Sequence, residues 1–245
     1  MKTSFNISIL GGRGYVGQEI IKIINNHPNF FISNIYSKSS QGKLVDDYNK
    51  SKSLTYKLLD SPDKLDFTDI DIVIMALSNN ESFDYIKSIE GHDPNIIIID
   101  ISADYRFDDG WAYKLPEVAT QTKDKRISNP GCYASAIQFS LFPIKHLING
   151  KVSCMGISGY SGAGATPNEK NDSNNLEGNI IPYSLSGHIH EKEVIKHCYE
   201  EISFSPHVAN FFRGILTTSH IQLTKKASSS EIYDLYKSFY KDKKL

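Results

Sequence analysis

The chain has 245 residues, of which 40% are hydrophobic and 22% charged, which suffices for one large or two smaller domains with buried cores. Its 27 basic and 28 acidic residues give a formal net charge of −1, which excludes the basic footprint of a nucleic-acid-binding protein. The longest apolar runs have the length of strands, so we expect no contact with a membrane.

The start of the chain predicts a strand, a glycine-rich turn and a helix. Residues 5–10 alternate into a short apolar run, and isoleucines recur with helical spacing after the turn. In this order a glycine turn typically binds a dinucleotide, because glycines let the backbone approach a pyrophosphate whose charge the helix N-terminus favours. The alternative is a tight turn without a ligand. We expect cofactor contacts from Gly11, Arg13, Gly14, Tyr15, Val16 and Gly17.

The end of the second predicted strand, residues 30–36, indicates which dinucleotide binds. An NAD site normally has an acidic residue here to hold the ribose 2′-hydroxyl, whereas a 2′-phosphate prefers hydroxyl groups and a cation. This strand runs into Ser37, Lys38 and Ser39, and no acid lies at its end. These residues favour NADP over NAD; the alternative is an ordinary polar loop.

Two further buried strands and a short helix are predicted at residues 71–77, 95–100 and 82–89. This alternation is typical of a doubly wound parallel sheet, which binds ligands at the carboxyl ends of its strands. We therefore expect Ser78 to contact the cofactor and Arg106 to contact the substrate. The alternative for Arg106 is a structural salt bridge with Asp104 or Asp100.

Residues 129–135 place a cysteine where a turn becomes a helix. Pro130 and Gly131 favour a tight bend, and the small and apolar residues after Cys132 can form a buried helix. The N–H groups and macrodipole at a helix N-terminus favour a thiolate, and they can stabilise the oxyanion that forms when it attacks a carbonyl. We interpret Cys132 as a nucleophile and Asn129 as a substrate contact. The alternative is a small buried cysteine.

From about residue 150 the pattern indicates a second, mainly antiparallel α/β domain. Strands are predicted at residues 152–158, 201–204 and 215–223, with a helix starting near residue 188. His207 and Arg213 bracket the loop before the last strand and can hold a carboxylate; the alternative is that Arg213 pairs within its own domain. The substrate contacts expected in this half are Ser158, Ser161, Gly162, His188, His207 and Arg213.

The predicted architecture is therefore α/β, with a Rossmann-like doubly wound parallel sheet and a second α+β domain for substrate binding. We place the NADP-binding domain at residues 1–131 and the catalytic domain at 132–245. Three cysteines provide no disulfide framework and favour a reducing compartment. We expect no metal.

Together these motifs resemble N-acetyl-γ-glutamyl-phosphate reductases, the NADPH-dependent enzymes of arginine biosynthesis, and the fungal mitochondrial branch more than the bacterial one. The matching segments occur in the family's order at residues 11–17, 100–107, 129–133, 159–167, 188–193 and 206–214. The resemblance implies that Cys132 forms a thioester with N-acetyl-L-glutamyl 5-phosphate, which is reduced to the 5-semialdehyde with release of phosphate. It makes His190 the acid/base, with His188 as the alternative.

The resemblance also implies a homo-oligomer that acts on a small molecule in the mitochondrial matrix. Fusion to, or association with, an acetylglutamate kinase belongs to the same expectation. The first strand begins within a few residues of Met1, so no presequence is visible, and a cytoplasmic location is the alternative.

The end of the chain departs from the family pattern. Family members continue past the region 233–243 with a strand pair and a final helix that packs on the nucleotide domain, whereas this sequence ends at Leu245. We expect poor turnover without that segment. Two other functions stay open: a truncated, catalytically silent NADP-binding or regulatory module, and an aspartate-semialdehyde-dehydrogenase-type enzyme. Segments 105–107 and 188–190 disfavour the latter.

Overall fold

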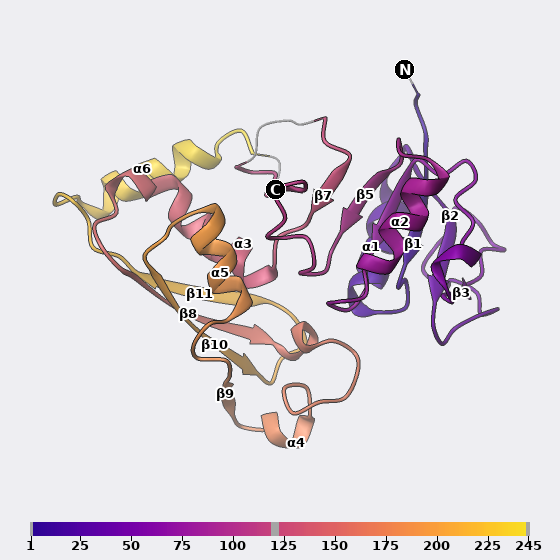
Figure 1. The fold of residues 1–245 in the computed structure, drawn as a ribbon. Helices are drawn as coiled ribbons and strands as arrows, with labels where there is room; N and C mark the ends of the chain where they lie inside the picture. The colour runs from indigo at the N-terminus through magenta and orange to yellow at the C-terminus, as the bar shows by residue number, and fades with distance from the viewer. Residues whose placement is uncertain (1, 119–122, 244–245) are drawn as a thin grey trace. The chain divides into compact units, whose positions relative to one another are not determined.

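The computed structural model describes residues 2–118 and 123–243. The chain forms two compact units, each with its own sheet and core (Figure 1). The first unit comprises Met1–Lys114 and Gln121–Asn129, and the second comprises Leu115–Thr120 and Pro130–Leu245. We expected the domain boundary after residue 131. The chain passes from the first unit to the second between Asn129 and Pro130, two residues earlier.

The first unit contains a parallel sheet with the strand order β3-β2-β1-β4-β5-β7-β6. Because all its pairings are parallel, the carboxyl ends of the strands meet at one edge. This confirms the predicted doubly wound sheet. Its elements are β1 (Phe5–Leu10), α1 (Tyr15–Asn26), β2 (Phe30–Ser37), β3 (Lys57–Leu58), the 3₁₀ helix η1 (Pro62–Lys64), β4 (Ile72–Met75), α2 (Phe83–His92), β5 (Ile97–Asp100), β6 (Ala112–Tyr113) and β7 (Arg126–Ser128).

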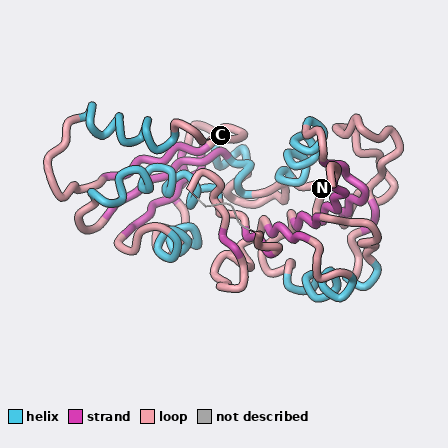
Figure 2. The backbone as a smooth tube through the Cα atoms, turned by 90° about the horizontal axis from the view of Figure 1, so that it is seen from above, coloured by secondary structure: helices cyan, strands magenta, loops and turns pink. Residues whose placement is uncertain are grey.

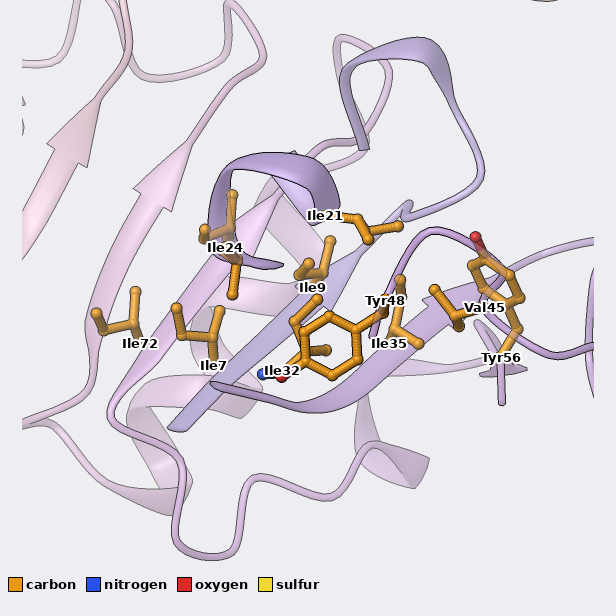
Figure 3. Packing of buried hydrophobic residues seen from close by; sticks show 11 residues of the cluster. Ile7, Ile9, Ile21, Ile24, Ile32, Ile35, Val45, Tyr48, Tyr56 and Ile72 are labelled. Atoms are coloured by element: carbon orange, nitrogen blue, oxygen red, sulfur yellow. Dashed lines mark hydrogen bonds between the residues drawn. The ribbon is translucent and has the colours of Figure 1, made fainter. Parts of the chain in front are cut away.

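Helices lie on both sides of this sheet (Figure 2). Both faces of the sheet are therefore buried, and its strands carry apolar side chains on both faces. Along the central strands successive side chains point to opposite faces. Ile7 and Ile9 belong to the cluster that includes Ile21 of α1, whereas Val73 and Met75 belong to the cluster on the α2 side. The first cluster, drawn in Figure 3, consists of Ile7, Ile9, Ile21, Ile24, Ile32, Ile35, Val45, Tyr48, Tyr56, Ile72 and Ile74.

The second unit contains a sheet with the order β11-β8-β10-β9 and three longer helices, α3, α5 and α6, over one of its faces (Figure 1). Residues Val152, Cys154 and Gly156 of β8 are buried beneath the helices, and the intervening Ser153 and Met155 are exposed. The elements are α3 (Cys132–Leu141), η2 (Phe142–Leu147), β8 (Val152–Gly159), η3 (Tyr160–Ala163), α4 (Ser173–Leu176), β9 (Ile180–Pro182), α5 (Ile189–His197), β10 (Ile202–Ala209), β11 (Ile215–His220) and α6 (Ser229–Tyr240).

Two details of the second sheet differ from the expectation. The sheet is mixed, because its central pair, β8 and β10, is parallel. Strand β10 also continues through Pro206 to Ala209, where a loop was expected. Proline cannot donate a ladder hydrogen bond, but β9 pairs with β10 only from His207 onward, so the missing donor at Pro206 leaves that pairing intact. Among the described residues, no helix combines the length and apolar character required to cross a membrane.

Candidate active site

The glycine turn of the first unit packs so closely that side chains would not fit. Gly11 has a φ of +85°, and a Cβ there would lie 2.2 Å from the carbonyl oxygen of Ala76. A Cβ at Gly17 would lie 2.6 Å from the carbonyl oxygens of both Gly11 and Gly12. Gly14 is the N-cap of α1, and no acidic residue occupies the first turn of that helix. The backbone dipole at this terminus therefore favours a bound anion, which fits a dinucleotide pyrophosphate.

The other predicted cofactor contacts lie around this turn and the neighbouring strand ends. Arg13, Gly14, Tyr15 and Val16 are exposed, as is Ser78 after β4. At the end of β2 the three predicted residues differ: Ser37 is buried, and its Oγ accepts a hydrogen bond of 3.3 Å from the backbone N–H of Ser39, whereas Lys38 and Ser39 are exposed. The Lys38 ammonium forms an ion pair of 2.7 Å with Glu81, a residue that the sequence pattern did not indicate.

A polar cluster fixes the loop that joins β4 to α2. The Asp100 carboxylate is fully buried and accepts hydrogen bonds of 2.7 Å from the hydroxyls of Ser82 and Ser102. Burial raises the pKa of Asp100. The Asp104 carboxylate accepts from the backbone N–H groups of Asn80 and Ser82 at 2.6 and 3.0 Å. Polar residues after β5 thus hold the loop after β4 at the carboxyl edge of the sheet.

Arg106 connects two segments at the same edge. Its side chain is buried, with its Nε 3.0 Å from the carbonyl oxygen of Asn129 and its Nη2 2.9 Å from that of Ile101. The Asn129 N–H in turn donates to the carbonyl of Asp100 at 2.8 Å. Arg106 therefore holds the backbone at Ile101, after β5, and at Asn129, after β7. The predicted substrate contacts of Arg106 and Asn129 stay predictions.

The cysteines of the second unit have contrasting environments. Cys132 is exposed and is the first residue of α3, with Gly131 as the N-cap. Cys154 and Cys198 are 4% and 5% exposed. Burial raises the pKa of the Cys154 thiol and raises that of Cys198 to about 12. Only Cys132 of the three combines access with a helix N-terminus, the setting that favours a reactive thiolate.

A buried carboxylate connects this cysteine segment to a histidine. Glu193 of α5 is fully buried, and its Oε2 accepts a hydrogen bond of 2.8 Å from the backbone N–H of Gly131. Its Oε1 lies 3.7 Å from Nε2 of His190, one helical turn earlier. Sequence reasoning did not select Glu193, although the spacing of three residues places it on the same helix face as His190. The Glu193 side chain thus contacts both Gly131, the N-cap of α3, and His190, the predicted acid/base.

The neighbouring histidine has a different environment. His188 is the N-cap of α5, and its Nδ1 accepts a hydrogen bond of 3.1 Å from the backbone N–H of His190. Burial, followed by the charge of Lys170, lowers the pKa of His188. The ring of Tyr133, which is 1% exposed, packs against both histidines at centroid distances of 6.4 and 6.1 Å. His188 therefore holds an accepting, unprotonated nitrogen as part of its capping contact.

Hydroxyl groups surround Tyr133. Its hydroxyl donates to the carbonyl of His207 at 2.5 Å and also hydrogen-bonds with Ser158 and Tyr183. Burial, with a smaller contribution from Cys132, raises the pKa of both tyrosines. Tyr183 thus lies in the same hydroxyl network as Ser158, one of the predicted substrate contacts.

The remaining predicted contacts lie on two adjacent segments. Ser161 and Gly162 belong to η3, whose backbone is held to the loop after β10 by the Ser161 N–H donating to Phe212 at 3.0 Å. The exposed Arg213 stacks on the Phe212 ring, 5.7 Å from its centroid. His207 has its Nδ1 3.2 Å from the carbonyl of Gly156. A carboxylate clamp formed by His207 and Arg213 stays a prediction.

The second unit therefore contains the parts of a nucleophilic site: an exposed thiol at a helix N-terminus, a histidine, and a buried carboxylate that contacts both this histidine and the backbone N–H of the residue before the thiol. Such a set can attack a carbonyl and move a proton to or from the resulting oxygen. Within residues 2–118 and 123–243, no group of three or more His, Cys, Asp or Glu side chains is arranged to hold a metal ion.

Comparison with known protein families assigns both units. Residues 6–125 match the semialdehyde dehydrogenase NAD-binding domain, and residues 132–245 match the semialdehyde dehydrogenase dimerisation domain. Among solved structures, aspartate semialdehyde dehydrogenase with NADP from Candida albicans aligns with a TM-score of 0.73 over 95% of this chain and 75% of that one. At 16% identity this likeness shows the fold alone.

Relatives of higher sequence identity show which branch of this family the chain resembles. N-acetyl-gamma-glutamyl-phosphate reductase of Stenotrophomonas maltophilia is 38% identical over 97% of this chain and 76% of its own length. The mitochondrial protein arg-6 of Neurospora crassa is 42% identical over 98% of this chain, which spans 28% of that relative's length. The chain likewise spans less than a third of the two other fungal mitochondrial relatives that it matches.

Proposed function

The chain belongs to the semialdehyde dehydrogenase family, in the branch of the N-acetyl-γ-glutamyl-phosphate reductases, and we propose that it reduces N-acetyl-L-glutamyl 5-phosphate to N-acetyl-L-glutamate 5-semialdehyde and phosphate with NADPH. The observation that carries this proposal is the placement of Cys132 at the N-terminus of α3, with Glu193 joining its N-cap to His190. An acyl phosphate is an activated carbonyl compound, which suits a thiolate nucleophile.

Cys132 supplies the nucleophile. Its thiolate forms a bond to the acyl carbon, the bond from that carbon to the phosphate oxygen breaks, and a thioester remains on the enzyme. The backbone N–H groups at the start of α3 stabilise the oxyanion at this stage. After the carbon has been reduced, the bond to Cys132 Sγ breaks, and the aldehyde leaves as the thiolate is regenerated.

His190 is the acid/base in this scheme, and Glu193 positions it. Reduction leaves a negative oxygen on the carbon bound to Cys132; His190 donates a proton to that oxygen and removes it when the aldehyde forms. The Glu193 carboxylate, 3.7 Å from His190 Nε2, stabilises the protonated ring. His188 is less suited to the role, because its Nδ1 is engaged as a helix cap and burial lowers its pKa.

We propose NADP as the cofactor of the first unit; when bound, it would supply hydride at the thioester carbon. Gly11, Gly14 and the N-terminus of α1 would hold the pyrophosphate, and Lys38 and Ser39 would hold the 2′-phosphate. The family model supports a nicotinamide dinucleotide in general, and the two residues after β2 support the phosphorylated form.

The test is the reverse reaction. Oxidation of N-acetylglutamate semialdehyde should require both phosphate and NADP⁺, and absorbance at the reduced nicotinamide band follows it directly. Aspartate semialdehyde serves as the matched control substrate. A higher kcat/KM with aspartate semialdehyde, or turnover without phosphate, would contradict the proposal.

The exposed face of the second sheet supports a homo-oligomer formed with a second copy of this chain. Leu216 and Met155 are 60% and 42% exposed on the side of the sheet opposite α3 and α5, and residues 132–245 match a dimerisation domain. Leu216→Glu should reduce the molar mass measured by light scattering to that of a monomer. Ile23→Glu, at a residue of the first unit that is 66% exposed, is the control and should leave the assembly intact.

The location and the kinase partner stay proposals. The mitochondrial names of the fungal relatives support the mitochondrial matrix for this chain. Import assays with isolated mitochondria test the location. Co-purification with an acetylglutamate kinase from the same cells tests the partner.

A further inference from the structure

The Lys38–Glu81 ion pair lies at the carboxyl edge of the first sheet, where a fold of this kind binds the adenosine half of a dinucleotide. Any role of the pair in binding rests on the proposed cofactor site. Lys38 directly follows β2, and Glu81 lies in the loop between β4 and α2. Strand β1 lies between β2 and β4 in the sheet. The ion pair therefore joins the two segments that flank β1 at its carboxyl end, where the glycine turn begins.

The acidic partner is held by its surroundings. Asp104 accepts hydrogen bonds from the backbone N–H groups of Asn80 and Ser82, the residues on either side of Glu81. The Glu81 side chain is 33% exposed, compared with 59% for Lys38. Glu81 is therefore the fixed member of the pair, and Lys38 is the member that can turn towards a ligand.

The pair combines the two kinds of side chain that distinguish NAD from NADP. An acidic side chain at this position accepts a hydrogen bond from the ribose 2′-hydroxyl of NADH, whereas a cation binds the 2′-phosphate of NADPH. The chain carries its cation in the segment after β2, and the acid comes from a residue 43 positions later. The absence of an acid directly after β2 in the sequence therefore does not mean that the site lacks one.

We propose that Glu81 limits the preference for NADPH that Lys38 creates. When NADPH binds, Lys38 leaves Glu81 for the 2′-phosphate, and the Glu81 carboxylate then repels that phosphate. When NADH binds, Lys38 stays with Glu81, and the second carboxylate oxygen of Glu81 accepts the ribose hydroxyl. Glu81 therefore weakens the binding of NADPH and strengthens that of NADH.

Fluorescence titration of NADPH and NADH against the wild-type chain, Glu81→Gln and Lys38→Met tests this role. In Glu81→Gln the ratio Kd(NADH)/Kd(NADPH) should rise by at least about threefold, a change of the size that exposed charge pairs produce. In Lys38→Met the ratio should fall below one, because the contact with the 2′-phosphate is lost while Glu81 still repels that phosphate and still accepts the ribose hydroxyl.

A matched control removes the same charge from a similar ion pair at the other end of the strands. Glu90 pairs with Arg126 at 2.8 Å, and Arg126 is the first residue of β7, so this pair lies away from the carboxyl edge. Glu90→Gln should leave the ratio unchanged. An unchanged ratio in Glu81→Gln, or an equal change in Glu90→Gln, would overturn the proposed role of Glu81 but not the proposed cofactor. Failure of the wild-type chain to bind either nucleotide would overturn the proposed cofactor as well.

Discussion

The two units build their proposed ligand sites by opposite means. The first unit uses backbone: Gly11 and Gly17 have no room for a side chain, and the turn they form presents helix N–H groups to an anion. The second unit uses side chains: Cys132, His190 and Glu193 are placed by a helix start, a helix face and a buried hydrogen bond. A substitution in the first unit should therefore act through steric strain, and one in the second through charge and proton transfer.

The largest effect should come from Cys132, because we propose that this residue forms the covalent bond to the substrate. Cys132→Ser should lower the rate of semialdehyde oxidation by at least about 10⁴-fold, within the range seen when a catalytic nucleophile is removed, and leave the Kd for NADPH unchanged. Cys154→Ser is the control, because Ser219 lies 3.2 Å from Cys154 Sγ and can accommodate a hydroxyl. Retention of more than about a hundredth of the rate by Cys132→Ser would contradict the nucleophile assignment.

Glu193 should be next in effect. Glu193→Gln keeps an acceptor for the Gly131 N–H but removes the charge beside His190, so kcat should fall by about 10²-fold, and its pH profile should change. Glu191→Gln is a closely matched control, because the Glu191 carboxylate on the same helix accepts a 2.7 Å hydrogen bond from the Phe204 N–H. Equal kcat values and pH profiles in the two variants would show that Glu193 is purely structural.

Two glycines of the first unit allow the steric effect of an added side chain to be distinguished from the effect of a left-handed backbone conformation. Gly11 and Gly42 have φ angles of +85° and +80°, but a Cβ at Gly42 would meet no atom within 4 Å. Gly42→Ala should lower the free energy of unfolding by about 1–2 kcal/mol through its left-handed conformation alone. Gly11→Ala should lower it by roughly 1–3 kcal/mol more and abolish nucleotide binding. Urea unfolding and fluorescence titration measure both, and equal losses would refute the steric argument.

The smallest effect concerns His188 and pH. The unfolded chain takes up a proton on this ring near pH 6.5, whereas the folded chain does so only at lower pH, because burial lowers the pKa of His188. The stability of the second unit should therefore decrease as the pH falls below about 6.5. His188→Asn keeps a good N-cap and removes the titrating ring, so its melting temperature should depend less on pH in this range. Identical pH dependences would contradict this account.

Local patterns in the sequence were sufficient to predict the elements that carry the site. The run of residues 5–10 predicted β1, the glycines and isoleucines predicted the turn and α1, and Pro130 and Gly131 predicted that Cys132 begins a helix. Each of these depends on residues close together in the chain, where propensity and periodicity act.

The contacts that complete the site could not be predicted in this way. Glu193 bonds to a residue 62 positions earlier, and Lys38 pairs with a residue 43 positions later. Such pairings are set by the order of strands and the packing of helices, which a local pattern does not contain. The extension of β10 through Pro206 also depended on a neighbour, since it is the short length of β9 that tolerates the proline.

The central claim, that Cys132 carries the substrate as a thioester, can be tested by mass spectrometry of the intact protein. Incubation with N-acetylglutamyl phosphate in the absence of NADPH should add one N-acetylglutamyl group, and peptide mapping should place it on Cys132, the exposed cysteine at the start of α3. Addition of NADPH should remove the group and release the semialdehyde. An adduct on Cys154 or Cys198, or semialdehyde formation by Cys132→Ser without any adduct, would contradict the claim.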